Sequence, residues 1–517
     1  MKKILSAALA AFMLALLSLA TIGCSPDESP AGTGPALTIS PSASGSAASS
    51  PAAPTPVATP EPYPSIADSG TTPRNSFSLS VTLNDAEHKL IVTQSLIYHN
   101  NTGTELKEIY FNLIPQAFRQ DGGGIDMKDI LIGNQPGSLE QVKETVYKLA
   151  LPSALVDKAQ VQIDMEYEVR IPNISNRFGY QETVFNLGNF IVTPVVYGAD
   201  GWVVEPYIDI GDAFYTDVAD YDVVIHVPEG YTVAATGEEV GNGLYRAENV
   251  RDFAFCASDS YETLSDSWED VTITVYFGDH MTQTAQRAME TAKNSLELYS
   301  KTFGKYPYTT LSIVMSGLTG GVAGMEYPTL IMISPETSLE AAADMVFEDG
   351  PTIQYYTVAL DNSVCHEIAH QWFYGVVGND QIAEPWLDEG FCRFCEYLYQ
   401  KAYPPSVSEE DGVYLMEDRL KDQYTQVVNA GSPDYPFQTV DLDESLYHYA
   451  PEEYGEIYEK GGSLLYMMEQ QMGETAFEEA LKEYVQRFAY GFVTTETFQE
   501  FWSSKADFSK LFQLYFA

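Results

Sequence analysis

Apolar and polar residues alternate along much of the N-terminal half of the chain. The period of two runs from Phe77 to Leu83, from Val161 to Ile171 and from Tyr221 to Val227. Because successive side chains of a strand point to opposite faces of a sheet, this period predicts strands with one buried face. We therefore expect an N-terminal β-domain over residues 73–264, built as a sandwich or saddle of antiparallel strands.

The spacing of apolar residues becomes helical after about His280. It predicts an amphipathic helix over 281–303, flanked by short strands over 271–277 and 311–315. Helical spacing then dominates to the C-terminus, including 462–471 and 475–489. Residues 265–517 are therefore expected to form a mixed α/β, mainly helical domain, and the whole chain a multidomain α+β protein.

The first residues have the pattern of an export signal. Lys2 and Lys3 precede an almost wholly apolar stretch that is short for a membrane span. The segment Ala20-Thr21-Ile22-Gly23-Cys24 resembles a bacterial lipobox, although Thr21 stands where leucine is commonest. We expect a lipoprotein signal peptide over 1–24, lipid attachment at Cys24 and a lipid-anchored location on the extracytoplasmic face of a bacterial cell membrane. An ordinary secretory signal is the alternative.

Residues 25–72 are dominated by Pro, Ala, Ser, Thr and Gly. Such a composition buries too little apolar surface to offset chain entropy, so it predicts a disordered tether. In a polyproline conformation this tether would reach on the order of 100 Å. No later stretch is long and apolar enough for a membrane span, so the N-terminal lipid would be the only contact with the membrane.

The chain is strongly acidic. Its 73 acidic and 27 basic side chains give a formal net charge of −46. Binding to phosphate groups needs Lys and Arg, so nucleic acid and anionic lipid headgroups are poor partners for this chain. The charge is typical of a solubilised extracellular surface.

His366-Glu367-Ile368-Ala369-His370 is the most specific chemical signal in the chain. Residues four apart share one face of a helix, so both imidazoles can bind one metal ion. Imidazole and carboxylate are ligands that zinc takes in hydrolytic sites, where one further position stays open for water. Glu389 follows far enough along the chain for a turn and a second helix to return its carboxylate to the histidines. The pattern predicts a hydrolase with one Zn²⁺ per chain, and a helix surface with two solvated histidines is the alternative.

The helix that carries this motif is predicted from near Thr357 to Tyr374, with Gly375 suited to its C-terminal cap. Pro385 suits the first turn of the following helix, where its missing N–H costs little. Trp372 and Phe373 are expected in the core.

Cysteine is sparse beyond Cys24. Cys256, Cys365, Cys392 and Cys395 are expected to be small buried thiols, although Cys392-x-x-Cys395 leaves a redox or zinc role open. A disulfide that involves Cys365 also stays open.

Three further motifs accompany the histidine helix. They are Gly321-Val322-Ala323-Gly324-Met325-Glu326-Tyr327-Pro328, Trp386-Leu387-Asp388-Glu389-Gly390-Phe391 and Tyr458-Glu459-Lys460-Gly461-Gly462. Together with His366-Glu367-Ile368-Ala369-His370-Gln371-Trp372-Phe373, their order and spacing resemble the membrane alanyl aminopeptidase family of gluzincin zinc metallopeptidases. The resemblance covers roughly residues 75–517, and it implies a thermolysin-like catalytic domain behind the β-domain.

The resemblance implies a role for each position that matches a catalytic residue of the family. His366, His370 and Glu389 match the zinc ligands, and Glu367 matches the general base that activates the zinc-bound water. Tyr458 matches the tyrosine that stabilises the oxyanion. These roles agree with general chemistry, because zinc lowers the pKa of its bound water to about 7 and a phenol O–H can donate to a developing oxyanion.

The resemblance also implies how the substrate is bound. Glu326 matches the glutamate that binds the substrate's free α-amine, and Gly324 and Met325 would line the bound peptide. A buried carboxylate pairs well with an ammonium group, whereas an internal peptide bond offers it no cation. Asp388 either orients a ligand or is a solvated acid, and Tyr454 is a further candidate for the pocket.

Two features depart from the family. Tyr327 stands where the common G-x-M-E-N signature has asparagine, which puts the details of amine recognition in doubt. The chain ends about where the family's catalytic domain ends, without the C-terminal helical domain of longer members. We therefore expect a more open cleft, or one that an unknown partner closes.

The sequence as a whole predicts a zinc aminopeptidase that removes N-terminal residues from peptides at the extracytoplasmic cell surface. A zinc endopeptidase with an open cleft and a catalytically inactive surface binding module are the alternatives.

Overall fold

The computed structural model describes residues 63–68, 70, 72–319, 322–344, 352–407, 411–430, 432, 441–442, 444–449 and 454–516. The predicted signal peptide with Cys24, most of the predicted tether over 25–72, and Gly321 lie outside the described residues. The chain from Pro62 onward forms one compact unit. Among the described helices, none combines the length and apolar character needed to cross a bilayer.

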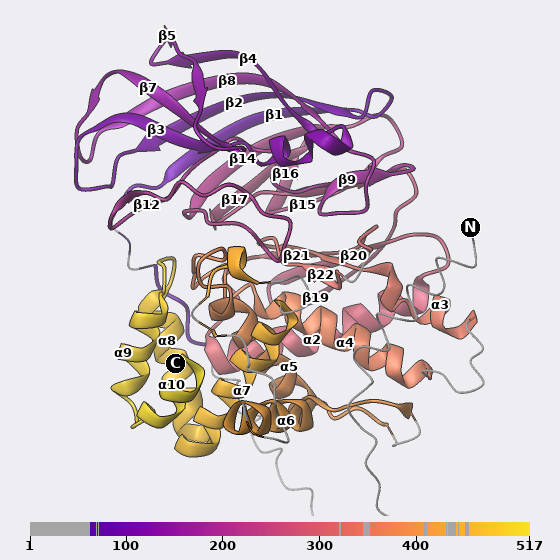
Figure 1. Cartoon of the computed structure of the whole chain (residues 1–517). Helices are drawn as coiled ribbons and strands as arrows, with labels where there is room; N and C mark the ends of the chain where they lie inside the picture. Colours follow the sequence, from indigo (N-terminus) through magenta and orange to yellow (C-terminus); the bar gives the residue numbers. More distant parts are fainter. Residues whose placement is uncertain are drawn as a thin grey trace, which may run out of the picture. The chain divides into compact units, whose positions relative to one another are not determined.

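The N-terminal part of this unit consists of packed β-sheets (Figure 1). Its largest sheet has the strand order β16 (Glu238–Gly241), β17 (Leu244–Val250), β14 (Ala219–His226), β1 (Asn75–Asn84), β2 (Lys89–His99), β8 (Gln160–Arg170), β4 (Gly124–Ile132) and β5 (Gln135–Pro136). Two four-stranded sheets have the orders β15 (Thr232–Ala235), β18 (Phe255–Ser258), β10 (Val184–Leu187), β9 (Phe178–Gln181) and β11 (Thr193–Pro194), β3 (Leu106–Asn112), β7 (Val146–Leu155), β6 (Leu139–Gln141). The hairpin of β12 (Tyr197–Gly198) and β13 (Gly201–Trp202) and the 3₁₀ helix η1 (Ile114–Asp121) complete this part.

The alternating pattern in the sequence correctly predicted the long strands of the large sheet. In β1 and β8 every second side chain is buried, and these residues join residues of both smaller sheets in one hydrophobic core. The prediction of purely antiparallel strands was wrong at one place, because β1 and β14 pair in parallel. Strands that pair in parallel need a long crossover connection, and here most of the β-domain lies between the two strands.

The second part is built on a mixed five-stranded sheet. Its strand order is β19 (Glu262–Trp268), β20 (Val271–Phe277), β21 (Thr310–Met315), β23 (Leu330–Ile333) and β22 (Gly324–Met325). The helices are α2 (Thr282–Phe303), α3 (Leu339–Asp344), α4 (Ile353–Ala369), α5 (Trp386–Ala402), α6 (Met416–Asn429), α7 (Tyr454–Met472), α8 (Glu474–Phe488), α9 (Thr495–Ser503) and α10 (Ser509–Tyr515), with 3₁₀ turns η2 (Pro335–Thr337) and η4 (Leu446–His448). Figure 1 shows this small sheet between the strands of the β-domain and the helices. The predicted helix over 281–303 and the strands over 271–277 and 311–315 are confirmed as α2, β20 and β21.

The helix that carries the histidine motif ends earlier than predicted. It is α4, and the chain leaves it through a series of turns. The left-handed conformation falls on Tyr374, with φ 99°, so the prediction that Gly375 caps the helix was wrong. A tertiary contact holds this turn, because the Tyr374 carbonyl is bound from the β-domain. Within the turn, Phe373 bridges to Val377.

Arg251 makes that contact from the β-domain. It is buried, and its Nε donates to the carbonyl of Tyr374 at 2.6 Å. Its two terminal nitrogens donate to the carbonyl of Thr216, at 3.1 Å, and to that of Gly491, at 2.6 Å. One guanidinium group therefore joins the β-domain, the turn after α4 and the segment between α8 and α9.

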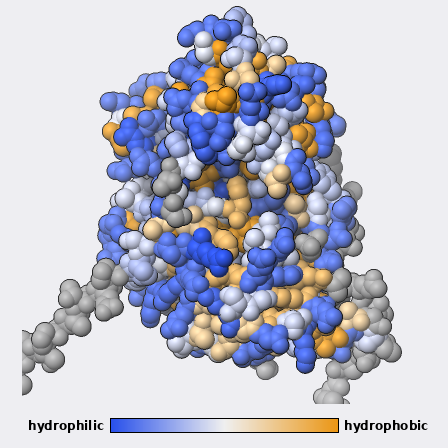
Figure 2. All heavy atoms as spheres, turned by 90° about the vertical axis from the view of Figure 1, so that its left-hand side faces the viewer, coloured by the Kyte–Doolittle hydropathy of each residue, from blue (hydrophilic) through white to orange (hydrophobic). Residues whose placement is uncertain are grey.

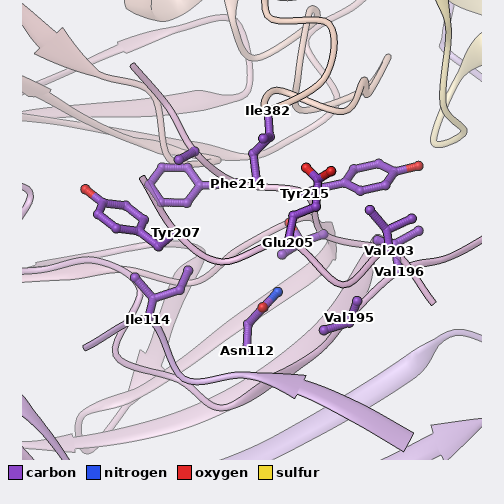
Figure 3. A pocket seen from close by; sticks show the side chains of 12 residues that line it. Asn112, Ile114, Val195, Val196, Val203, Glu205, Tyr207, Phe214, Tyr215 and Ile382 are labelled. Atoms are coloured by element: carbon purple, nitrogen blue, oxygen red, sulfur yellow. The ribbon is translucent and has the colours of Figure 1, made fainter. Parts of the chain in front are cut away.

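A small cavity lies where the β-domain meets the loop before α5. It measures about 20 Å³, and Asn112, Glu205 and Ile382 are among its walls (Figure 3). This volume suits about one water molecule and excludes a peptide side chain. The cavity is therefore not the place where a substrate binds.

Hydrophilic residues cover much of the β-domain on the face shown in Figure 2, whereas apolar residues gather over the middle and lower part of that face.

Candidate active site

The predicted metal ligands meet where the end of α4 faces the first turn of α5. His366 Nε2 lies 3.1 Å from Glu389 Oε2 and 3.2 Å from His370 Nε2. His370 Nε2 lies 3.5 Å from Glu389 Oε2. Ligand atoms about 2.1 Å from a tetrahedral zinc ion are about 3.4 Å from one another. Both the donor types and this triangle of atoms therefore fit Zn²⁺.

Each imidazole is oriented by a contact on its other nitrogen. His366 Nδ1 lies 2.9 Å from Glu396 Oε1, and His370 Nδ1 lies 3.1 Å from the carbonyl oxygen of Phe373. If both Nδ1 atoms donate to these acceptors, both Nε2 lone pairs face the metal position. Arg393 holds the Glu396 carboxylate through contacts of 2.8 and 2.9 Å.

Glu396 was not singled out in the sequence. A signal was present, because Glu389, Arg393 and Glu396 follow one face of a helix at i, i+4 and i+7. A carboxylate on the face of the third ligand is a natural partner for a metal-bound imidazole. The sequence could not show which histidine it contacts.

Glu367 lies beside the triangle, and its carboxylate leaves no room for a side chain at position 324. Its side chain is buried, and a Cβ atom on Gly324 would lie 2.2 Å from Glu367 Oε1. Burial raises the pKa of Glu367 to about 8, because the charged form loses solvation. A cation at the neighbouring triangle would lower this pKa towards neutrality, which suits a group that accepts and returns a proton.

Two tyrosines of α7 reach the other oxygen of the third ligand. The hydroxyl of Tyr458 donates to Glu389 Oε1 at 2.5 Å, and that of Tyr454 donates to the same atom at 3.3 Å. The β-domain supports them through Gly211, which has φ 60°, because a Cβ there would lie 2.4 Å from the Tyr454 ring. The phenol O–H of Tyr458 therefore lies beside the third predicted metal ligand.

Glu326 follows the edge strand β22 and faces the same centre. One of its carboxylate oxygens forms a group with Glu367 and His370 in which the candidate ligand atoms lie within 4.8 Å of one another. Burial raises the pKa of Glu326 to about 7. Gln381 Nε2 donates to Glu326 Oε1 at 3.0 Å.

The other residues of that strand have different surroundings. Met325 is fully buried and packs in the core of the β-domain, so its backbone rather than its side chain is available at the sheet edge. Tyr327 extends into the β-domain, where its hydroxyl donates to Asn189 Oδ1 at 2.7 Å. A Cβ on Gly188 would lie 1.9 Å from the same hydroxyl oxygen. The residue that replaces asparagine in the signature thus ties the strand to the β-domain.

Gln371 links the segment between β22 and β23 to the turn that follows α4. Its Oε1 accepts from the backbone N–H of Thr329 at 2.7 Å, and its Nε2 donates to the carbonyl of Tyr327 at 3.2 Å. It is fully buried. The distance between the Glu326 segment and the metal ligands is therefore held by side-chain hydrogen bonds as well as by packing.

The remaining candidates are buried. Asp388 accepts from Asn379 at 3.1 Å and from Gln381 at 2.6 Å, so the alternative of a solvated acid is wrong. Trp372 and Phe373 are core residues, as predicted. All of Cys256, Cys365, Cys392 and Cys395 are free and buried, so within the described part of the chain no disulfide forms at Cys365.

A His-Glu-x-x-His helix, a carboxylate from the next helix and a mixed sheet with β22 at its edge form an arrangement of the kind that zinc metallopeptidases use. Residues 287–515 match the peptidase family M1 domain. This C-terminal part of the chain therefore carries a peptidase family M1 domain.

Similar proteins agree with this assignment. The chain is 32% identical over 134 residues to aminopeptidase N of Oryctolagus cuniculus, which covers 25% of this chain and 13% of that protein. It is 28% identical over 211 residues to tricorn protease-interacting factor F2 of Thermoplasma volcanium, covering 39% of this chain and 24% of that protein. The match thus spans less than a quarter of the length of these curated relatives.

The fold is similar to that of solved structures over most of the chain. An M1 zinc metallopeptidase from Deinococcus radiodurans superposes with a TM-score of 0.59 at 17% identity, covering 86% of this chain and 92% of that one. A mutant of that enzyme bound to a Tyr-Ser-Ala substrate gives a TM-score of 0.57 at 18% identity, covering 86% and 94%. The predicted combination of an N-terminal β-domain and a mainly helical catalytic domain is therefore confirmed.

Proposed function

We propose that this protein is a zinc-dependent aminopeptidase. The observation that carries the proposal is a buried carboxylate, Glu326, beside the metal triangle and the base Glu367. In an amino acid the α-nitrogen lies only about 2.5 Å from the carbonyl carbon. A group that binds the α-amine must therefore lie within a few ångströms of the reacting centre, which is where Glu326 stands.

The residues of the site divide the reaction between them. Zinc, when bound by His366, His370 and Glu389, supplies a Lewis acid that polarises the substrate carbonyl and promotes ionisation of water. Glu367 takes a proton from the attacking water and returns it to the leaving amine. The hydroxyl of Tyr458 donates to the carbonyl oxygen as negative charge develops, and loss of such a donor costs about 3 kcal/mol of barrier.

Glu326 determines which peptide bond of the substrate is cleaved. Its carboxylate accepts from the substrate's α-ammonium group, and an internal peptide bond offers no such cation. The edge strand β22 offers backbone groups to an extended peptide, which is a common mode of peptide recognition. Cleavage then falls after the first residue of a peptide with a free N-terminus.

The experiment uses the zinc-loaded protein on a panel of aminoacyl fluorogenic amides, with and without chelator. We expect chelator-sensitive cleavage of free-amine substrates and none of their N-acetylated forms. Glu326→Ala should lower kcat/KM for free-amine substrates by about 100-fold, since a buried ammonium then lacks its partner. Equal cleavage of blocked substrates would indicate an endopeptidase, and binding without any cleavage would indicate an inactive binding module.

We further propose that the enzyme acts at the extracytoplasmic face of a bacterial cell membrane, held there by a lipid on Cys24. The apolar segment and the lipobox-like sequence before Cys24 support this. Cys24→Ala should release the protein from the membrane fraction, and retention of the variant in that fraction would contradict the proposal.

A further inference from the structure

The carboxylate of Glu326 depends on one neighbour for its orientation. In the described part of the chain, the hydrogen bond to its side chain comes from Gln381 Nε2, which lies 3.0 Å from Oε1. Both residues are buried, with 2% of the surface of each exposed. The amide of Gln381 is therefore the hydrogen-bond donor that orients this carboxylate.

The same amide nitrogen is shared with a second acid. Gln381 Nε2 also donates to Asp388 Oδ2 at 2.6 Å, while Asp388 Oδ1 accepts from Asn379 Nδ2 at 3.1 Å. The two N–H groups of one amide thus serve two carboxylates. A flipped amide would point its oxygen at both acids, so the nitrogen must face them.

This chain of contacts links two functional elements. Asp388 directly precedes the metal ligand Glu389 in α5, whereas Glu326 follows β22 on the sheet edge. Gln381 lies on the loop between α4 and α5. Its amide therefore binds both Asp388, at the start of α5, and the carboxylate of Glu326. The position of Glu326 is in this way coupled to that of the helix that carries the third metal ligand.

The oxygen of the Gln381 amide supports this reading. It is buried and has no hydrogen-bond partner in the described residues. A buried acceptor without a donor costs free energy, so what this side chain contributes here comes from the two hydrogen bonds of its nitrogen.

We propose that Gln381, oriented by Asp388, is a positioning residue that holds Glu326 for recognition of the substrate's α-amine. This inference rests on the proposed aminopeptidase function. Gln381 acts through Glu326 rather than on the reacting atoms. Its loss therefore weakens the preference for a free amine more than it weakens binding to zinc.

The test uses two inhibitors that differ only in the α-amine: leucine hydroxamate and the corresponding des-amino hydroxamate. Both bind zinc through the hydroxamate, so the ratio of their Ki values measures amine recognition. In zinc-loaded Gln381→Met we expect this ratio to fall by about 10-fold, because a hydrogen bond to a charged group is lost. The Ki of the des-amino inhibitor should stay within about twofold of wild type, since it does not use Glu326.

Matched variants separate positioning from general damage. Gln400 is also a buried glutamine of this domain, and it bonds to Asn362 and to the backbone of Met416 rather than to the site. Gln400→Met should change the melting temperature but not the Ki ratio. Gln381→Glu keeps the shape and removes the N–H donors, so it should lower the ratio as well, and Asp388→Asn should lower it less.

The outcomes are distinct. A wild-type protein without preference for the amine would refute the proposed function, and with it this inference. A wild-type preference that survives intact in folded Gln381→Met or Gln381→Glu would refute the positioning role alone. Equal weakening of both inhibitors at unchanged zinc content would also refute it, because that is the signature of a disturbed site.

Discussion

At the scale of single residues, the proposed chemistry depends on the position of the Glu367 carboxylate and on the residues that surround it. The carboxylate lies against the Cα of Gly324 and close to the imidazole of His370. Gly324 comes from β22, whereas His370 lies on the same stretch of chain as Glu367, at the end of α4.

Glu367→Gln should retain zinc and lose turnover. The amide has the same shape as the carboxylate but cannot take a proton from water, so we expect kcat to fall by at least about 10³-fold. Zinc content by atomic absorption and the melting temperature should stay close to wild type. Activity near the wild-type level would refute the role of Glu367 as the base.

Gly324→Ala tests the contact between strand and base. The added methyl group would lie 2.2 Å from Glu367 Oε1, so either the carboxylate or the strand must move. Because small misplacements of catalytic groups are costly, we expect kcat/KM to fall by about 100-fold with zinc retained. Gly317→Ala is the control, since its Cβ would meet only Gln181 Oε1, at 3.9 Å. Equal activity in the two variants would contradict the prediction.

At the scale of elements, the end of α4 is held from outside the helix. The carbonyl of Phe373 orients His370, and the next residue, Tyr374, has the left-handed conformation that side chains seldom adopt. Arg251 of the β-domain binds the carbonyl of Tyr374. The geometry of a metal ligand thus depends on a residue of the other domain.

Arg251→Met should weaken both the fold and the metal site. Three buried carbonyls lose their donor, which we expect to cost about 2–4 kcal/mol of stability. The turn at Tyr374 is then less well held, so zinc affinity measured by chelator competition should fall by about 10-fold. Arg246→Met is the control, because that residue forms an exposed pair with Asp222, so both the stability and the zinc affinity should stay close to wild type. Unchanged zinc affinity in Arg251→Met would refute the link to His370.

At the scale of the whole molecule, several acidic side chains are buried together at the site, and a bound cation would balance their negative charge. Burial raises the pKa of Asp388 to about 7, that of Glu326 to about 7 and that of Asp212 to about 6. Exposed carboxyl groups titrate near pH 4, so between about pH 4 and 7 the folded state holds protons that the unfolded chain has released. The stability that these groups contribute is present at low pH and is lost as pH rises through 6 to 7.

The histidine ligands add to this trend in the metal-free protein. Burial lowers the pKa of His366, but contacts with Glu389 and Glu396 outweigh it and raise the pKa to about 9. Protonated imidazole paired with carboxylates therefore also stabilises the fold at low pH, and this contribution is lost as pH rises towards 9.

The melting temperature of the chelated protein should therefore fall as pH rises from about 5.5 to about 8. With zinc bound, the cation offsets the negative charge, so the zinc-loaded protein should melt higher and depend less on pH over that range. At a free zinc concentration about 1,000 times Kd, the gain is about 4 kcal/mol. Calorimetry of both forms checks this, and a melting temperature that rises with pH in the chelated form would contradict it.

Local sequence patterns predicted much of the fold and of the candidate site. The alternation around Val161 predicted strand β8, and one helical turn between His366 and His370 was enough to place two ligands on one face. Tyr458 and Glu326 were recognised from their motifs, and the structure brings both to the histidines. Such features depend on neighbours within a few residues, which the sequence displays directly.

Contacts between distant segments could not be read in the same way. Nothing near Gly375 showed that Tyr374 would take the left-handed turn, because Arg251, remote in sequence, holds that carbonyl. The parallel pairing of β1 with β14 and the binding of Gln381 to both Glu326 and Asp388 are of the same kind. The sequence by itself determined the periodicity of the elements and the chemistry of the metal ligands, since both are encoded within a turn of helix or a run of strand. Tertiary structure alone decided which side chains orient those ligands, because that depends on how remote segments pack against one another.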